Sequence, residues 1–113
     1  MHNVVLYHGT DAVSANDILN HGVHAAKAAH YNGVGEFWAT TDSQAADWFA
    51  KANPANGSPA RLSFEVPQAT LRSLVTSRPV LARTDGQGTY EFLPASFLIL
   101  NQQMTGKQVM AVV

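Results

Sequence analysis

The residues with the clearest capacity for chemistry stand at the end of an apolar run near the start of the chain. Residues 4–7 are apolar and valine-rich, which is typical of a buried strand, and His8, Gly9 and Thr10 follow directly. Imidazole and hydroxyl groups can hydrogen-bond a ligand, while glycine lets a ligand or another backbone come close. The segment therefore predicts either the floor of a binding site or a strand-to-helix turn capped by Thr10 or Asp11.

Aromatic residues further along the chain could form walls for a flat ring. Phe37 and Trp38 lie in a short apolar stretch, and Trp48 follows Phe37 by eleven positions. A strand aromatic and a helix aromatic at this spacing can enclose a planar ligand. The alternative is ordinary core packing, which is common for aromatic residues near a strand–helix junction.

A single carboxylate, Glu91, stands between two aromatic residues in the second half of the chain. Side chains alternate between the two faces of a strand, so Glu91 points away from the face that Tyr90 and Phe92 share. If the two aromatic residues are in the core, Glu91 faces solvent or a cleft.

Histidines raise the question of a metal site. His21 and His24 are three residues apart and His30 follows, but Gly22 separates the first two. Structural zinc usually has a regular set of ligands, and the chain has no cysteine. We expect no metal.

The pattern of apolar residues predicts two helices in the first half of the chain and mostly strands in the second. Helices are expected over residues 11–22, with Gly22 as the C-terminal cap, and over 43–52, capped by Asp42. A capping box between Ser14 and Asp17 would make the first helix start later. A short helix is expected from Pro67 to residue 74.

Expected strands are 3–7, 36–40, 61–66, 80–83, 89–93, 97–101 and 109–113, with turns at 85–88 and 105–106. This is an α+β pattern in one domain, residues 1–113.

The order of these motifs resembles the ADP-ribosyltransferase superfamily. Residues 8–10 match the His-Gly-Ser/Thr strand that opens such domains, and residues 35–39 match its Gly-x-Tyr-Phe-Ala pattern. Trp48 stands where a second stacking tyrosine follows eleven residues after the first. The chain looks closest to the branch with a His–Tyr–Glu triad, which includes diphtheria toxin and the poly-ADP-ribose polymerases, and is similar to small bacterial toxin-like domains. The resemblance, firmest over residues 4–50, implies a split β-sheet core.

The same resemblance implies an NAD-dependent mono-ADP-ribosyltransferase of toxin or effector type. By its pattern, His8 would bind a ribose hydroxyl of NAD, the backbone of Gly9 would hold the nicotinamide carboxamide, and Thr10 would line the adenosine ribose. ADP-ribose would pass to a macromolecular acceptor, either a protein or a nucleic acid. A toxin-type domain also implies a cognate antitoxin or immunity protein as a partner.

The remaining roles fall on aromatic residues and on one carboxylate. Phe37 and Trp48 would sandwich the nicotinamide ring. If the match to the family pattern is shifted by one residue, Trp38 takes the place of Phe37. Glu91 matches the family glutamate, so the implied catalytic set is His8, Phe37 and Glu91. A carboxylate beside the ribose would stabilise the positive charge that develops as the nicotinamide–ribose bond breaks. NAD is then a co-substrate, and no metal is needed.

Departures from the family pattern keep other functions open. Phe37 lacks the hydroxyl of the triad tyrosine, and Thr89 stands two residues before Glu91, where arginine-modifying members carry Gln or Glu. The alternatives are an NAD glycohydrolase on the same site, or an inactive module of the same fold that binds NAD, ADP-ribose or a partner.

Composition narrows the class of partner. The net charge is −1, and the seven Lys and Arg residues are spread along the chain, which disfavours binding of duplex nucleic acid through its phosphates. No apolar run approaches the ~20 residues needed to cross a bilayer, and no signal peptide is recognisable. We therefore expect a cytoplasmic protein without a membrane partner, with delivery into another cell left open.

Overall fold

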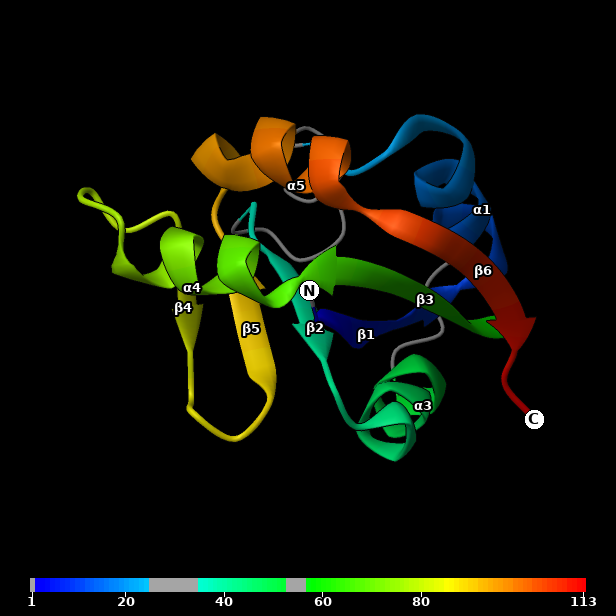
Figure 1. Ribbon diagram of the computed structural model, residues 1–113. Coiled ribbons are helices and arrows are strands. Elements are labelled where there is room, and N and C mark those ends of the chain that lie inside the picture. Colours follow the sequence, from blue (N-terminus) through cyan, green and yellow to red (C-terminus); the bar gives the residue numbers. More distant parts are fainter. Residues whose placement is uncertain (1, 25–34, 53–56) are drawn as a thin grey trace.

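The computed structural model describes residues 2–24, 35–52 and 57–113. Its strands are β1 (Asn3–Asp11), β2 (Phe37–Thr40), β3 (Pro59–Pro67), β4 (Ala82–Thr84), β5 (Thr89–Phe92) and β6 (Thr105–Ala111). Its helices are α1 (Ala12–His21), α3 (Ser43–Ala52), α4 (Gln68–Thr76) and α5 (Phe97–Gln103), with a 3-10 turn η1 (Pro94–Ser96). The strands form one antiparallel sheet in the order β4-β5-β2-β1-β3-β6 (Figure 1). This confirms the predicted α+β class.

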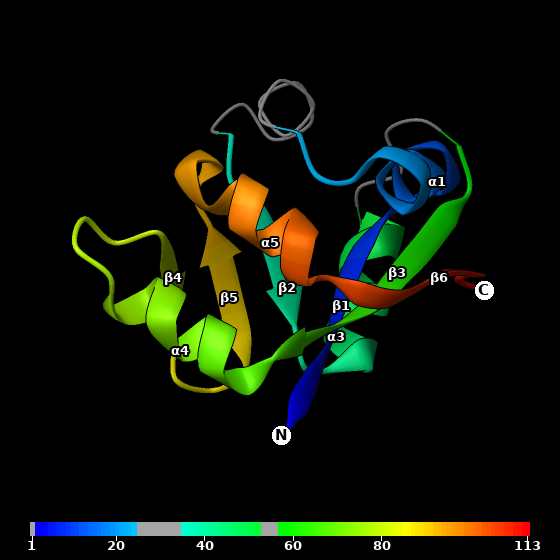
Figure 2. The same ribbon diagram turned by 45° about the horizontal axis from the view of Figure 1, so that its top comes forward.

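The hydrophobic core lies on one face of the sheet. β3 alternates strictly between half-buried and buried residues, and its buried side chains pair in register with the core face of β1, as Phe64 does with Leu6. Residues of α1, α4 and α5 complete this cluster, for example Leu74 and Leu100. Figure 2 shows α4 and α5 lying over the sheet. Helix α3 packs separately, through contacts with β1 and β3 on the opposite face.

Helix α1 begins and ends through identifiable caps. The Asp11 carboxylate accepts hydrogen bonds from the backbone N–H of Ser14 at 2.8 Å and from its hydroxyl at 3.0 Å. At the other end Gly22 adopts a φ of 80°, and its backbone N–H donates to the carbonyl of Ile18. The predicted bounds are therefore confirmed, and the later start through Ser14 and Asp17 is wrong because Asp11 already caps the helix.

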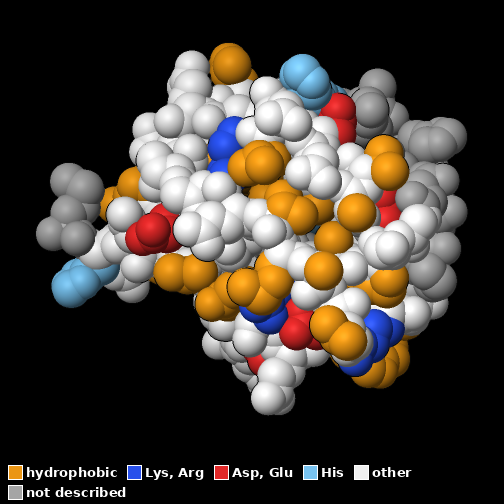
Figure 3. Space-filling view, turned by 90° about the vertical axis from the view of Figure 1, so that its right-hand side faces the viewer, with side chains coloured by type: hydrophobic (Ala, Val, Ile, Leu, Met, Phe, Trp, Pro, Cys, Tyr) orange, Lys and Arg blue, Asp and Glu red, His pale blue; other side chains and the backbone are white. Residues whose placement is uncertain are grey.

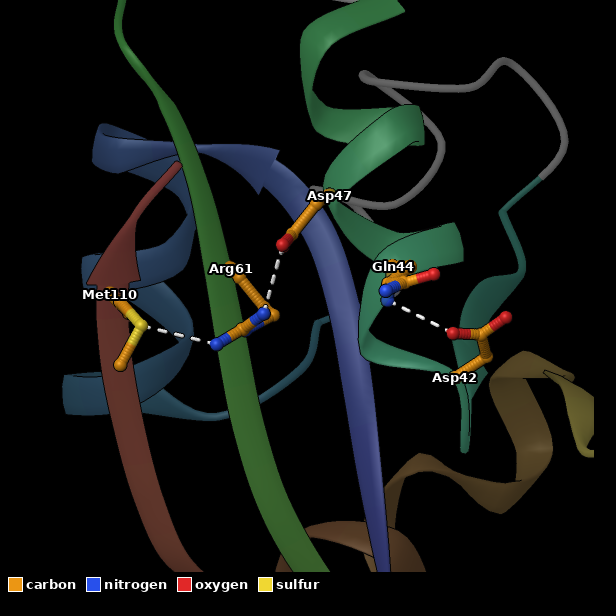
Figure 4. A network of polar contacts seen from close by, with 5 residues as sticks. All are labelled: Asp42, Gln44, Asp47, Arg61 and Met110. Carbon is orange, nitrogen blue, oxygen red and sulfur yellow. Dashed lines mark hydrogen bonds and ion pairs between the residues drawn. The ribbon is translucent and has the colours of Figure 1, made fainter. Parts of the chain in front are cut away.

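Helix α3 is fixed to the sheet by an ion pair. Asp42 caps it as predicted, because its carboxylate accepts from the backbone N–H of Gln44 at 3.0 Å. Arg61 of β3 reaches both carboxylate oxygens of Asp47 at 3.0 and 3.1 Å, and its other nitrogen donates to the sulfur of Met110 (Figure 4). Arg61 thus connects α3, β3 and β6.

The prediction of a strand over residues 97–101 is wrong, since these residues begin α5. A short apolar run fits a strand or a buried helix equally well in sequence. In the structure Phe97 and Leu100 are buried three residues apart, while Leu98 between them is 72% exposed, which is the spacing of one helix face. The η1 turn at Pro94 sets the direction in which this helix starts.

Several strand ends also differ from expectation. β1 continues four residues past the expected end, because β3 pairs with it as far as Asp11. β6 already begins at Thr105 and includes Gly106, where a turn was predicted, and it ends at Ala111. β4 covers residues 82–84, at the end of the expected 80–83. In each case the paired neighbour decides where the strand ends.

Candidate functional site

The sheet is weakly joined at its centre. β1 pairs with β3 along all nine of its residues, and β2 pairs with β5 along all four of its own. Between β1 and β2 the described register contains one pair, Tyr7 with Thr40. The sheet therefore consists of two three-stranded halves that meet at this pair, and the residues of β1 after Tyr7 have no strand partner on the β2 side.

His8 occupies the junction between the two halves. Its Nδ1 lies 2.6 Å from the backbone carbonyl oxygen of Trp38 in β2. A carbonyl oxygen can only accept, so Nδ1 carries the proton and Nε2 keeps its lone pair. Burial lowers the pKa of His8 below its usual 6.5, although the bond to Trp38 and the charge of Asp11 act in the opposite direction. The imidazole is therefore neutral near pH 7, in one tautomer, with Nε2 as an acceptor for a ligand hydroxyl.

We expect this neutral histidine to make the fold less stable in mild acid. Because the pKa of His8 is lower in the folded than in the unfolded chain, unfolding takes up a proton below the unfolded value of 6.5. The contribution of His8 is thus fully present above that pH and declines as the pH falls toward the lowered pKa. Urea unfolding at about pH 7.5 and about pH 5 should show a larger loss for the wild type than for His8→Asn. Equal losses in the two proteins would contradict the assignment of neutral His8.

Phe37 lies in the core beside His8. Its side chain is 4% exposed, and its ring centroid is 4.4 Å from that of His8 and about 6 Å from those of Phe64 and Phe92. In this position it supports the imidazole from the core side. Its surface is not accessible to a ligand.

The two residues that follow His8 have different surroundings. Thr10 lies two positions on, hence on the same face of β1, and is half-buried. A side chain at Gly9 would point to the other face, where its Cβ would lie 1.9 Å from the carbonyl oxygen of Ala46. The close approach that the sequence predicted for Gly9 is therefore made by the backbone of α3.

A second group of side chains lies on the sheet face that carries α3. In the antiparallel register Trp38 is directly opposite Glu91, and Glu91 is directly opposite Arg83. Directly opposed residues share a face, with Cβ atoms roughly 5 Å apart. This row, Trp38–Glu91–Arg83, crosses β2, β5 and β4. The predicted orientation of Glu91, away from Phe92, agrees with the register and with the burial of Phe92.

His8 and Glu91 are on opposite faces of the sheet and are linked through Trp38. The Trp38 backbone carbonyl accepts from His8, while its side chain neighbours Glu91. The structure therefore does not bring the side chains of His8 and Glu91 together on one face.

The aromatic residues are not arranged as the resemblance implies. Trp48 is 70% exposed on the outer side of α3, whose inward face is formed by Ala46 and Ala50. Phe37 is in the core on the opposite side of the sheet, so the structure does not bring it together with Trp48. Trp38, 45% exposed and beside Glu91, is the aromatic residue that a ligand at this carboxylate would meet.

Arg83 is a site residue that sequence analysis missed. Its Nη1 donates to Oε1 of Glu91 at 2.8 Å. Eight positions separate the two residues, and only the turn between β4 and β5 brings them opposite each other. A predicted hairpin around residues 85–88 could have suggested the pair if the register had been known.

Two of the three histidines considered as metal ligands lie within the described residues. His21 and His24 are exposed, and His30 lies outside the described residues. Over residues 2–24, 35–52 and 57–113, no three His, Asp or Glu side chains gather in a way that could hold a metal ion.

The surface near β6 shows no concentration of positive charge. Figure 3 shows Lys and Arg side chains on this face as separate groups among hydrophobic and neutral ones. Exposed hydrophobic residues at this end of the chain include Met110 and Val113. Within the described part of the chain, none of the helices has the length and apolar character needed to span a membrane.

A scan against models of protein families finds no match to this chain, and searches of curated proteins and of solved structures find no similar protein. Functional inference therefore rests on the geometry of the site.

Proposed function

We propose that this protein is an NAD-dependent mono-ADP-ribosyltransferase that cleaves the nicotinamide–ribose bond and transfers ADP-ribose to a macromolecular acceptor. The proposal includes the finer fold assignment, a split sheet of the ADP-ribosyltransferase type. The halves of the sheet meet at one residue pair, which supports this assignment.

The observation that carries the proposal is the state of His8. The Trp38 carbonyl fixes its tautomer, and its lowered pKa keeps it neutral, so Nε2 can accept from a ribose hydroxyl. The imidazole stands beside the single described pair between β1 and β2, Tyr7 with Thr40. In this role His8 orients the sugar and transfers no proton.

Glu91 and Trp38 would act at the nicotinamide end of NAD. The nicotinamide ring is flat and cationic in NAD, and an indole face attracts such rings by stacking and by cation–π interaction. Glu91, directly opposite Trp38, would stabilise the positive charge that develops on the ribose as the bond to nicotinamide breaks. The electron pair of that bond leaves with nicotinamide, the acceptor forms the new bond to the same ribose carbon, and the acceptor's proton is released to solvent.

The test is to incubate the full chain with NAD and to measure the release of nicotinamide. A transferase releases nicotinamide faster when a lysate fraction or RNA is added as acceptor, and labelled ADP-ribose becomes attached to it. Equal release in water alone would indicate a glycohydrolase. The absence of release with every acceptor would contradict the proposal.

The two tryptophans give a prediction that separates the stacking candidates. Trp38→Ala should raise the KM for NAD about tenfold, because loss of a stacked ring costs roughly 1–2 kcal/mol. Trp48→Ala should leave the KM within about twofold, since that side chain points away from the sheet. Steady-state kinetics on both variants provides the measurement. A large effect of Trp48→Ala with none of Trp38→Ala would assign the ring wall to α3.

A second candidate is an inactive module of the same fold that binds NAD or ADP-ribose. Two observations favour it: Phe37 is buried where the family triad has tyrosine, and Glu91 is already engaged by Arg83. Calorimetric titration that shows NAD binding without nicotinamide release would support this function.

A further inference from the structure

Glu91 is almost enclosed by its two neighbours across the sheet. Trp38 lies opposite it on β2 and Arg83 opposite it on β4, and the Glu91 side chain is 13% exposed. Arg83 itself is 64% exposed on β4, the edge strand of the sheet. The guanidinium thus approaches the carboxylate from the outer edge of the sheet, and Trp38 lies on its inner side.

The ion pair uses one oxygen of the carboxylate. Arg83 Nη1 donates to Oε1 at 2.8 Å, and no described residue donates a hydrogen bond to Oε2. Charge-assisted hydrogen bonds of this length are short and directional. Holding Oε1 therefore restricts the rotation of the carboxylate while Oε2 stays available.

The hairpin between β4 and β5 keeps Arg83 in this register. The Asp85 carboxylate accepts from the backbone N–H of Gln87 at 2.7 Å and of Thr89 at 3.1 Å, and these bonds lower its pKa. The hydroxyl of Thr84 also donates to the carbonyl of Thr89 at 2.9 Å. The hairpin is thus tied by its own polar groups.

The geometry points to Arg83 as the positioning residue of the site: its guanidinium holds Oε1 of Glu91 so that Oε2 is presented beside Trp38. This inference rests on the proposed function, because it assigns Arg83 a part in the same reaction. Arg83 acts on the orientation of Glu91 and does not contact the substrate.

The kinetic test compares two variants of Arg83 with a matched control. Arg83→Gln should lower kcat for nicotinamide release about tenfold with the KM for NAD within about twofold, because orientation is lost and binding is not. Arg83→Lys should restore part of kcat, since an ammonium can still donate to Oε1. Arg72→Gln removes a positive charge from an exposed position on α4, where it forms no ion pair with a described residue, and should change neither constant.

A second measurement detects the ion pair without using activity. Urea unfolding of Arg83→Gln, Glu91→Gln and the double variant should give shifts that are not additive, with the double shift smaller than the sum. This non-additivity should weaken at high salt, because the pair is partly exposed.

The outcomes separate the two hypotheses. If the wild type releases no nicotinamide, both the proposed function and the role of Arg83 are overturned, whatever the unfolding data show. If the wild type is active and Arg83→Gln keeps its kcat, only the role of Arg83 is overturned. A raised KM with unchanged kcat would mean that Arg83 binds the substrate directly, which also overturns the positioning role.

Discussion

Replacing Glu91 with Gln is expected to lower the rate of nicotinamide release by about 10²–10³-fold, the usual cost of removing one preorganised electrostatic group. The amide has nearly the same size and can still lie between Trp38 and Arg83, so the fold should be retained. It carries no negative charge, however, and cannot stabilise the cation that develops on the ribose. Nicotinamide release by the purified variant, with circular dichroism as a check of folding, gives the measurement.

The matched control for this experiment is Glu65→Gln. Glu65 is a half-buried carboxylate on β3, in the half of the sheet that does not contain Glu91. Its substitution removes the same charge from the protein and should leave the rate of release unchanged. Similar losses in both variants would mean that net charge, and not the position of Glu91, controls the reaction.

Gly9→Ala is expected to have the largest effect on stability, a loss of about 3 kcal/mol or more in the free energy of unfolding. The added Cβ would lie 1.9 Å from the carbonyl oxygen of Ala46 and 3.0 Å from the backbone nitrogen of Ala50. Both contacts are with the backbone of α3, so no side chain can rotate away and the helix must move. Because Asp47 ties α3 to Arg61, that movement also strains the ion pair. Urea denaturation monitored by tryptophan fluorescence gives the measurement.

A second glycine separates this clash from the general effect of the substitution. Gly86 has a φ of 76° and open space around the position of its Cβ. Gly86→Ala should therefore cost only about 1 kcal/mol, from the left-handed backbone conformation. A loss at Gly9 no larger than that at Gly86 would contradict the tight packing of α3 on β1.

Local signals in the sequence predicted the elements that local interactions control. Helix caps are an example: Asp11 and Asp42 begin helices and Gly22 ends one, each through hydrogen bonds to residues within four positions. Such patterns can be recognised along the chain. The prediction of a strand over residues 97–101 is wrong because the choice between helix and strand depends on which side chains the rest of the fold buries. The predicted end of β1 is wrong for a similar reason, since its last residues form a strand only because β3 pairs with them.

The candidate site was predictable in its residue types and less so in its arrangement. Alternation gave the orientation of Glu91 correctly, but it could not decide whether Phe37 or Trp38 faces the core, because both are large and apolar. The partner of Glu91 depends on the β4–β5 register, and the partner of His8 depends on a contact across thirty positions. Neither is encoded by local sequence.

The strand order has a consequence for how the chain folds. The two central strands, β1 and β2, come first in the sequence, but the described residues give them a single shared pair, Tyr7–Thr40. Each finds its main partner far along the chain: Leu6 pairs with Phe64, and Trp38 pairs with Glu91. Such long-range pairing costs loop-closure entropy before contacts repay it, which slows folding. During synthesis the first half of the chain therefore has little sheet to form until the second half emerges, and the six strands are expected to fold together as one cooperative unit.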